Sequence, residues 1–145
     1  MNASSPVVDA SGLLILLYDF GERAVDFLRE CTTSSLIYYE IGNAIWKECF
    51  LVGRFSSSEA FRLLSLAFKI LNIMHIVHLN EELGTIALKL AGKLKITYYD
   101  AVYLAIAQNL NSVLVTEDKK LAKAAEGASV KVMNVKQFIS QKFLC

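Results

Sequence analysis

The stretch Val113-Leu114-Val115-Thr116-Glu117-Asp118-Lys119-Lys120-Leu121 indicates the fold class of this chain. A short apolar run rich in β-branched residues is typical of a buried strand, and an acidic residue after it is typical of a helix start. The same order recurs at Val7-Val8-Asp9, which a helical pattern follows. Strands that alternate with helices are typical of a parallel sheet covered by helices. The sequence therefore predicts an α/β fold, a three-layer α/β/α sandwich with a central parallel sheet.

The rest of the chain continues this alternation without repeats, low-complexity tracts or linkers, so we expect a single domain over residues 1–145. Further strands are predicted at 31–33, 75–78 and 130–133. Helices are predicted at 11–18, 22–30, 36–52, 97–110, 119–126 and 135–142, and two more begin after the capping residues Ser56 and Asn80. Within 36–52, apolar residues at helical spacing predict one buried stripe: Ile37, Ile41, Ala44, Ile45, Cys49 and Val52.

Composition favours a folded cytoplasmic protein without a membrane anchor. Of the 145 residues, 54% are hydrophobic and 20% are charged, which excludes a disordered or fibrous chain. The longest unbroken apolar run, Leu13–Tyr18, is far shorter than the roughly 18 residues that cross a bilayer. The first residues carry no basic side chain, so no secretory signal is expected. Cys31, Cys49 and Cys145 fit neither a disulfide framework nor a zinc site, which favours a reducing cytoplasm.

The high apolar content of so small a chain also predicts hydrophobic surface that a partner covers. The segments 13–18 and 61–71 are the expected candidates, and a homodimer would use some of this surface.

Charge is distributed unevenly along the chain. Residues 119–145 carry six lysines against one acid, Glu126, for a net charge of +5, whereas residues 1–118 carry −4. Such a division would allow a cation to bind in one place and a polyanion beside it. A solvated basic face is the simpler alternative.

Four carboxylates follow predicted strands or lie in the first turns of predicted helices: Asp9, Glu40, Asp100 and Asp118. Each has an ordinary structural explanation. Asp9 and Asp118 can cap helix N-termini, Thr97 with Asp100 matches a capping box, and Glu40 favours the helix dipole. In a parallel sheet, however, all strands end at one edge, where α/β proteins place their sites. Carboxylates gathered there would repel one another unless cations lay between them.

The chemical type of the donor groups predicts which cation would bind there. A set of carboxylates without His or Cys is the ligand set for Mg²⁺ or Mn²⁺. Such an ion can activate water and neutralise a scissile phosphate, so the cluster is typical of phosphodiester hydrolysis. Polar side chains near the acids are candidates for orienting water or contacting substrate, with ordinary capping and surface polarity as the alternative: Ser11, Asn43, Thr116 and Lys47.

Four motifs occur in order between about residues 5 and 140: Val7-Val8-Asp9-Ala10-Ser11, Glu40-x-x-Asn43-Ala44, Tyr99-Asp100-Ala101-x-Tyr103-Leu104-Ala105 and Leu114-x-Thr116-x-Asp118-x-x-Leu121. Together they resemble the motifs of PIN domains. The chain is most similar to the small VapC-type PIN proteins, which are the toxins of prokaryotic toxin–antitoxin pairs.

The resemblance implies a Mg²⁺- or Mn²⁺-dependent endoribonuclease that cleaves RNA. It also implies a cognate antitoxin, whose short C-terminal segment would lie across the site. The same fold retained as a non-catalytic module that binds protein or RNA is the alternative. By resemblance, the catalytic and metal-binding acids are Asp9, Glu40, Asp100 and Asp118, with Asn43 and Thr116 as polar support.

Overall fold

A five-stranded parallel sheet forms the centre of the protein. The structure is a computed structural model that describes residues 4–143, so Cys145 lies outside the described residues. The sheet has the order β3-β2-β1-β4-β5, and every neighbouring pair is parallel. The predicted α/β fold class is therefore confirmed. The strands are β1 (Val7–Val8), β2 (Thr32–Ser34), β3 (His75–Val77), β4 (Leu114–Val115) and β5 (Val132–Met133).

Helices connect consecutive strands, and most begin where the sequence predicts. The Ser56 and Asn80 side chains accept hydrogen bonds from the backbone N–H groups of Glu59 and Leu83, so both cap their helices. The helices are α1 (Ala10–Phe20), the 3₁₀ turn η1 (Gly21–Ala24), α2 (Val25–Leu28), α3 (Ile37–Trp46), the π-helix η2 (Lys47–Leu51), α4 (Ser57–Leu71), α5 (Glu81–Leu94), α6 (Tyr98–Asn109), α7 (Lys119–Glu126) and α8 (Val135–Phe143).

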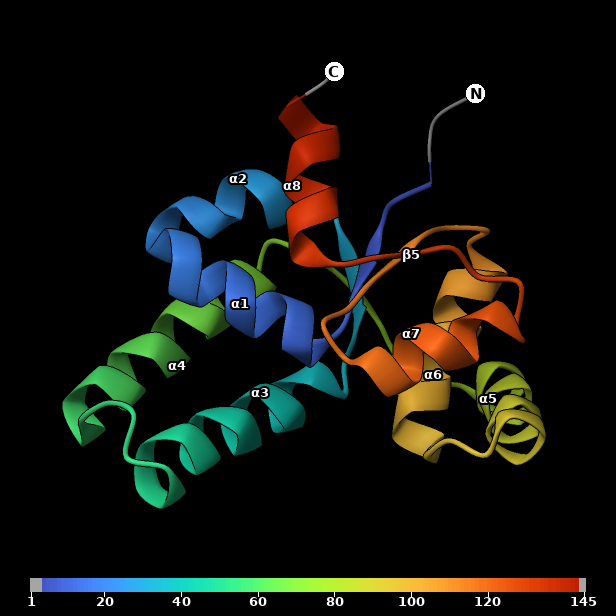
Figure 1. The fold of residues 1–145 in the computed structure, drawn as a ribbon, viewed down its shortest axis with the longest axis horizontal. Coiled ribbons are helices and arrows are strands. Elements are labelled where there is room, and N and C mark those ends of the chain that lie inside the picture. Colours follow the sequence, from blue (N-terminus) through green and yellow to red (C-terminus); the bar gives the residue numbers. More distant parts are fainter. Residues whose placement is uncertain (1–3, 144–145) are drawn as a thin grey trace.

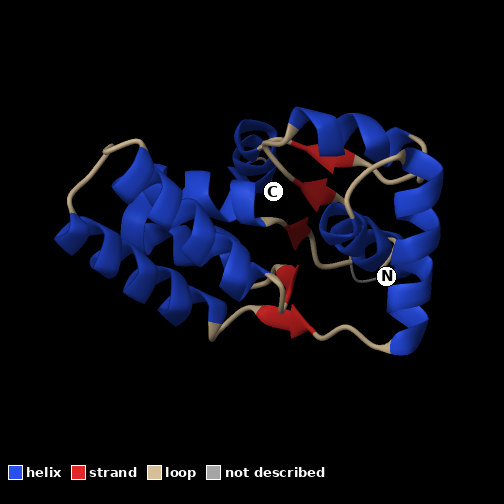
Figure 2. Cartoon of the chain, turned by 90° about the horizontal axis from the view of Figure 1, so that it is seen from below, coloured by secondary structure: helices blue, strands red, loops and turns tan. Residues whose placement is uncertain are grey.

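Helices cover both faces of the sheet (Figure 2). Two separate hydrophobic clusters lie between the sheet and these two helical layers. Adjacent strand residues face opposite ways: Val8 and Val115 pack with α1–α4 and α8, while Val7 and Leu114 pack with α5–α7. This alternation is the two-residue period of a β-strand. The central strands are buried on both faces, as expected for a parallel sheet between helices.

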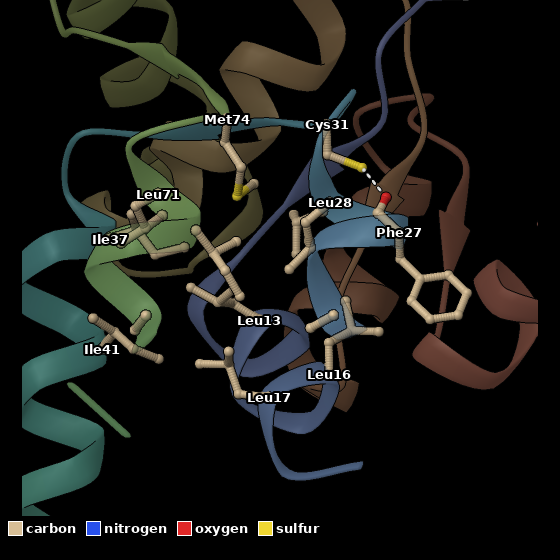
Figure 3. Packing of buried hydrophobic residues seen from close by; sticks show 14 of the residues in the cluster. Leu13, Leu16, Leu17, Phe27, Leu28, Cys31, Ile37, Ile41, Leu71 and Met74 are labelled. Atoms are coloured by element: carbon tan, nitrogen blue, oxygen red, sulfur yellow. Dashed lines mark hydrogen bonds between the residues drawn. The ribbon is translucent and has the colours of Figure 1, made fainter. Parts of the chain in front are cut away.

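Helix α1 is part of the core rather than a covered surface. Leu13, Leu16 and Leu17 are buried against α2, α3 and α4, and Figure 3 shows them meeting Leu28 and Ile41. The expectation that 13–18 provides surface for a partner is therefore wrong. The apolar run is explained by its position, because α1 lies between the sheet and the outer helices.

Helix α3 continues into the π-helix η2, and together with α4 it extends away from the sheet (Figure 1). We call residues 37–71 the helical arm. Most of the predicted stripe is buried or half-buried, but Val52 is exposed. The Val52 N–H bonds the carbonyl of Lys47, five residues earlier, so the wider turn rotates the following residues off the stripe.

No helix within residues 4–143 is long and apolar enough to cross a membrane.

Gly12 permits the close approach of α1 to the two central strands. A Cβ atom at this position would lie 3.0 Å from the Val115 carbonyl oxygen and 3.2 Å from Cγ1 of Val8. The carbonyl also accepts a hydrogen bond from the Asp9 N–H, so it cannot move freely.

We expect Gly12→Ala to lower the free energy of unfolding by about 1–3 kcal/mol, because the added methyl group overpacks the junction. Urea denaturation measures this. The matched control is Gly92→Ala in α5, where nothing lies within 4 Å of the new Cβ. There, alanine should be stabilising by up to about 1 kcal/mol. Equal effects of the two substitutions would contradict the packing argument.

Candidate active site

The four predicted acids meet in one pocket at the edge where the parallel strands end. Asp9 directly follows β1, Asp118 follows β4, and Glu40 and Asp100 lie in the first turns of α3 and α6. The pocket has a volume of about 350 Å³. Seven of the eight predicted site residues line it: Asp9, Ser11, Glu40, Asn43, Lys47, Asp100 and Asp118. The eighth, Thr116, is not part of the lining but donates a hydrogen bond to Asp9.

Asp9 is buried and hydrogen-bonded through both carboxylate oxygens. Its Oδ1 accepts from the Gly12 N–H at 2.9 Å and from the Ser11 hydroxyl at 2.7 Å. Its Oδ2 accepts from the Thr116 hydroxyl. The bond to Gly12 caps α1, so the structural explanation of Asp9 holds together with its place in the pocket.

Ser11 and Thr116 form a polar bridge between the β1 and β4 ends. Their hydroxyl oxygens lie 3.2 Å apart. Ser11 Oγ accepts from the Glu117 N–H, and Thr116 Oγ1 accepts from the Asp118 N–H. The two hydroxyls therefore fix the backbone that carries Asp118 relative to Asp9.

Asp118, rather than its neighbour Glu117, faces the pocket. Oδ1 of Asp118 accepts from the N–H groups of Lys120 and Leu121 and caps α7. The Glu117 carboxylate is held elsewhere, since its Oε1 accepts from the Val135 N–H at the start of α8. Asp118 thus has one oxygen committed to the helix cap.

Asp100 sits in the first turn of α6, where its N–H donates to the Thr97 hydroxyl at 3.1 Å. This capping contact uses the backbone of Asp100 and leaves its carboxylate available to the pocket.

Tyr103 is a site residue whose role the sequence reasoning missed. Its hydroxyl donates to Oε1 of Glu40 at 2.6 Å, and its side chain is 1% exposed. The contact joins α6 to α3 across 63 residues and orients the Glu40 carboxylate. The signal was the i, i+3 spacing of Asp100 and Tyr103, which places them on the same side of a helix.

Asn43 on α3 and Lys47 at the start of η2 lie at the exposed side of the pocket, beyond Glu40. Within the part of the chain that is described, neither side chain forms a hydrogen bond or an ion pair. Both are therefore accessible to a ligand.

Burial and mutual repulsion both disfavour the charged forms of these acids. Burial raises the pKa of Asp9 above its usual value, and the charge of Asp118 adds to the rise. Burial raises the pKa of Glu40 to about 7, with further increases from Asp9 and Asp100. Burial, then the charge of Asp118, raises the pKa of Asp100. A cation in the pocket would relieve this repulsion.

The donor chemistry fits a hard divalent cation, since every acidic ligand offers oxygen. Across residues 4–143, no group of three or more acidic, histidine or cysteine side chains is arranged to hold a metal ion. Mg²⁺ is commonly held by only one or two carboxylates and retains several waters. The pocket therefore fits an ion of this type that keeps part of its hydration, rather than one enclosed by protein ligands.

A family model for the PIN domain matches residues 7–127, which is most of the chain. The chain belongs to the PIN domain family. This membership confirms the resemblance carried by the four sequence motifs.

Two curated relatives of this PIN domain come from Pyrobaculum aerophilum. Ribonuclease VapC3 is 34% identical over 122 residues, covering 81% of this chain and 92% of the relative. Exonuclease VapC9 is 32% identical over 122 residues, covering 84% of this chain and 86% of the relative.

Solved structures share the fold. The crystal structure of PAE2754 from Pyrobaculum aerophilum has a TM-score of 0.77 and 26% identity, covering 97% of both chains. A toxin–antitoxin complex from Klebsiella pneumoniae has a TM-score of 0.61 and 19% identity, covering 89% of this chain and 96% of that one. At that identity, the second likeness concerns the fold alone.

The raised pKa of Glu40 predicts that the metal-free PIN domain loses stability as pH rises. A carboxyl whose pKa is higher in the folded state contributes stability that is fully present below its ordinary pKa of 4.5 and lost as pH rises through about 7. We therefore expect lower stability at pH 8 than at pH 5.5 in EDTA, measured by urea denaturation. Glu40→Gln, which stays neutral, should reduce this difference.

Two variants serve as controls for this pH dependence. Glu22→Gln removes an exposed carboxylate in η1, the turn that follows α1, and should leave the pH dependence unchanged. Tyr103→Phe removes the hydrogen bond that opposes the rise in the Glu40 pKa, so the loss of stability should move to higher pH. A pH dependence identical in wild type and Glu40→Gln would contradict the assignment to Glu40.

Proposed function

We propose that this PIN domain is a divalent-metal-dependent endoribonuclease and the toxin of a type II toxin–antitoxin pair. The observation that carries the proposal is the meeting of Asp9, Glu40, Asp100 and Asp118, from four separate elements, in one pocket. Carboxylates whose pKa values are raised by burial and by one another are typical of a site that works with a cation. The name of the relative Ribonuclease VapC3 supports RNA as substrate.

The chain's own residues have distinct roles in this proposal. Asp9 and Asp100 would hold the main Mg²⁺ or Mn²⁺ ion, and Glu40 and Asp118 would complete the site or hold a second ion. When bound, the ion stabilises charge on the scissile phosphate and lowers the pKa of a water. Tyr103 orients Glu40 through the 2.6 Å hydrogen bond. The products would be 5′-phosphate and 3′-hydroxyl ends.

Asn43 and Lys47 act on the substrate side of the pocket. Lys47 carries a positive charge at the pocket lining and is exposed, which suits contact with a phosphate of the RNA. Asn43 lies one helical turn from Glu40 and offers an amide that orients water or the Glu40 carboxylate.

The proposal includes cleavage within the RNA strand rather than from its end. This point needs its own test, because the two curated relatives carry different names, ribonuclease and exonuclease. A circular substrate separates the two activities, since an exonuclease needs a free end.

The partner of the toxin would be a cognate antitoxin. A structural neighbour from Klebsiella pneumoniae is a toxin–antitoxin complex with the same fold, which supports such a partner here. We infer that a short segment of the antitoxin lies across the acidic pocket and excludes RNA. The reducing cytoplasm inferred from the cysteines remains the proposed location.

A homodimer is the second proposed assembly, and the helical arm is its proposed interface. Of the eleven large apolar side chains that are exposed in the described residues, seven lie on the arm. Exposed apolar side chains concentrated on one part of a small protein are typical of an interaction surface. Phe61 on α4, which is 69% exposed, is the most exposed of these apart from Tyr39.

The nuclease is tested by incubating purified protein with linear and circular single-stranded RNA in Mg²⁺, Mn²⁺ or EDTA. We expect both RNAs to be cut with either metal and neither to be cut in EDTA. Asp9→Asn and Asp100→Asn should each lower the rate on the order of 10²-fold or more, because several kcal/mol of charge stabilisation is lost.

Asp19→Asn is the matched control, since Asp19 is an exposed carboxylate of α1 far along the helix from Asp9. It should cut like the wild type. Cutting that survives in both site variants would come from a contaminant. No cutting and no metal binding by calorimetry would favour the non-catalytic module that binds protein or RNA.

The dimer is tested by sedimentation velocity. The wild type should have twice the chain mass of 16.1 kDa, and Phe61→Asp should shift it to the monomer. The control, Leu88→Asp, introduces the same charge at a 65% exposed position on α5 and should remain dimeric. Dissociation by Leu88→Asp alone would place the interface on α5 instead.

A further inference from the structure

A second groove lies beside the acidic pocket, between α7 and the segment that leads into β5. It has a volume of about 610 Å³, and its lining includes Lys119, Lys123 and Lys131. Figure 1 shows α7 and β5 on the same side of the molecule. The role proposed for the acids leaves this groove unexplained, and it contains three of the six lysines that make residues 119–145 basic.

The groove adjoins the proposed active site. Asp118 lines both the groove and the acidic pocket. Thr116, whose hydroxyl donates to Asp9, also lines the groove. A linear ligand that occupies the acidic pocket and passes Asp118 would therefore reach the groove.

The lysines of the groove are free to bind a ligand. Lys119, Lys123 and Lys131 are exposed, and among the described residues none of them takes part in an ion pair. Lys119 and Lys123 are four residues apart on α7, so they project from one face of the helix. Lys131 lies directly before β5. Its backbone carbonyl accepts a hydrogen bond from the Leu114 N–H, which fixes it beside β4.

Three acids also line the groove, and their hydrogen bonds to backbone N–H groups do not remove their charge: Glu117, Asp118 and Glu126. Asp118 belongs to the proposed metal site, so a bound divalent cation would offset its charge. Three lysines then stand against Glu117 and Glu126, which leaves the lining a net charge of +1.

We propose that single-stranded RNA on one side of the scissile phosphate lies in this groove, with its phosphates against Lys119, Lys123 and Lys131. The inference rests on the proposed function and deepens it by giving the substrate a path. Lysines bind phosphates as point charges without reading bases, so this contact adds affinity and not sequence preference. Lys47, at the start of η2 and in the lining of the acidic pocket, is the cation for the other side of the cleaved bond.

The path predicts that substrate length matters. An RNA too short to reach the groove meets only the acidic pocket, whereas a longer strand also gains the lysine contacts. Each phosphate contact to single-stranded nucleic acid adds about 0.7 to the slope of log affinity against log salt.

The test uses Lys123→Ala/Lys131→Ala and a control double variant with the same net charge, Arg23→Ala/Lys89→Ala on η1 and α5, away from the groove and the helical arm's outer face. We measure cleavage of an RNA of about 20 nucleotides and of an RNA of about 4 nucleotides across a range of NaCl concentrations. For the longer RNA, the groove variant should raise KM about tenfold with kcat unchanged and lower the salt slope by about 1.4. For the shorter RNA, it should match the control.

Equal KM values and salt slopes in the two double variants would overturn the proposal that RNA lies in the groove. An anisotropy titration of the fluorescently labelled longer RNA in Mg²⁺ is a readout that needs no cleavage. If the wild type cuts no RNA, the proposed function fails, and this titration still decides whether the groove binds RNA. Weaker binding by the groove variant than by the control supports it, and equal binding overturns it.

Discussion

The hydrogen bonds of Asp9 join the two strands on which the acidic pocket is built. Asp9 follows β1 and Thr116 follows β4, so the bond between their side chains fixes the ends of two neighbouring parallel strands. The same carboxylate accepts from Gly12 and thereby sets the start of α1. Burying a carboxylate is costly, and these donors offset part of that cost. The placement of Ser11 and Asp118 depends on this junction.

The acids of the pocket serve the fold and the site together. Asp9 and Asp118 each cap a helix, and Asp100 supplies the N–H that Thr97 accepts. A role in helix capping is therefore correct for each of these residues taken alone. It does not explain why their side chains gather in one pocket. Their meeting follows from the topology, since helices that begin at the ends of parallel strands bring their N-termini to one edge.

Sequence patterns were sufficient for the order of elements and for the acidic cluster, because strand–acid–helix junctions are local signals. They were insufficient where packing between distant segments decides the outcome. The apolar run at 13–18 is equally compatible with a core helix and an interface, and only the outer helices make it core. The exposure of Val52 depends on one π turn, and the contact of Tyr103 with Glu40 depends on how α3 and α6 lie together.

The strand order has a consequence for the time at which the pocket forms during synthesis. The central strand β1 pairs with β4, more than a hundred residues later, so local contacts cannot complete the sheet around it. Asp9 and Glu40 are synthesised well before Asp118. A nascent chain therefore holds only part of the acid set, and the full pocket appears only after β4 and Asp118 have left the ribosome.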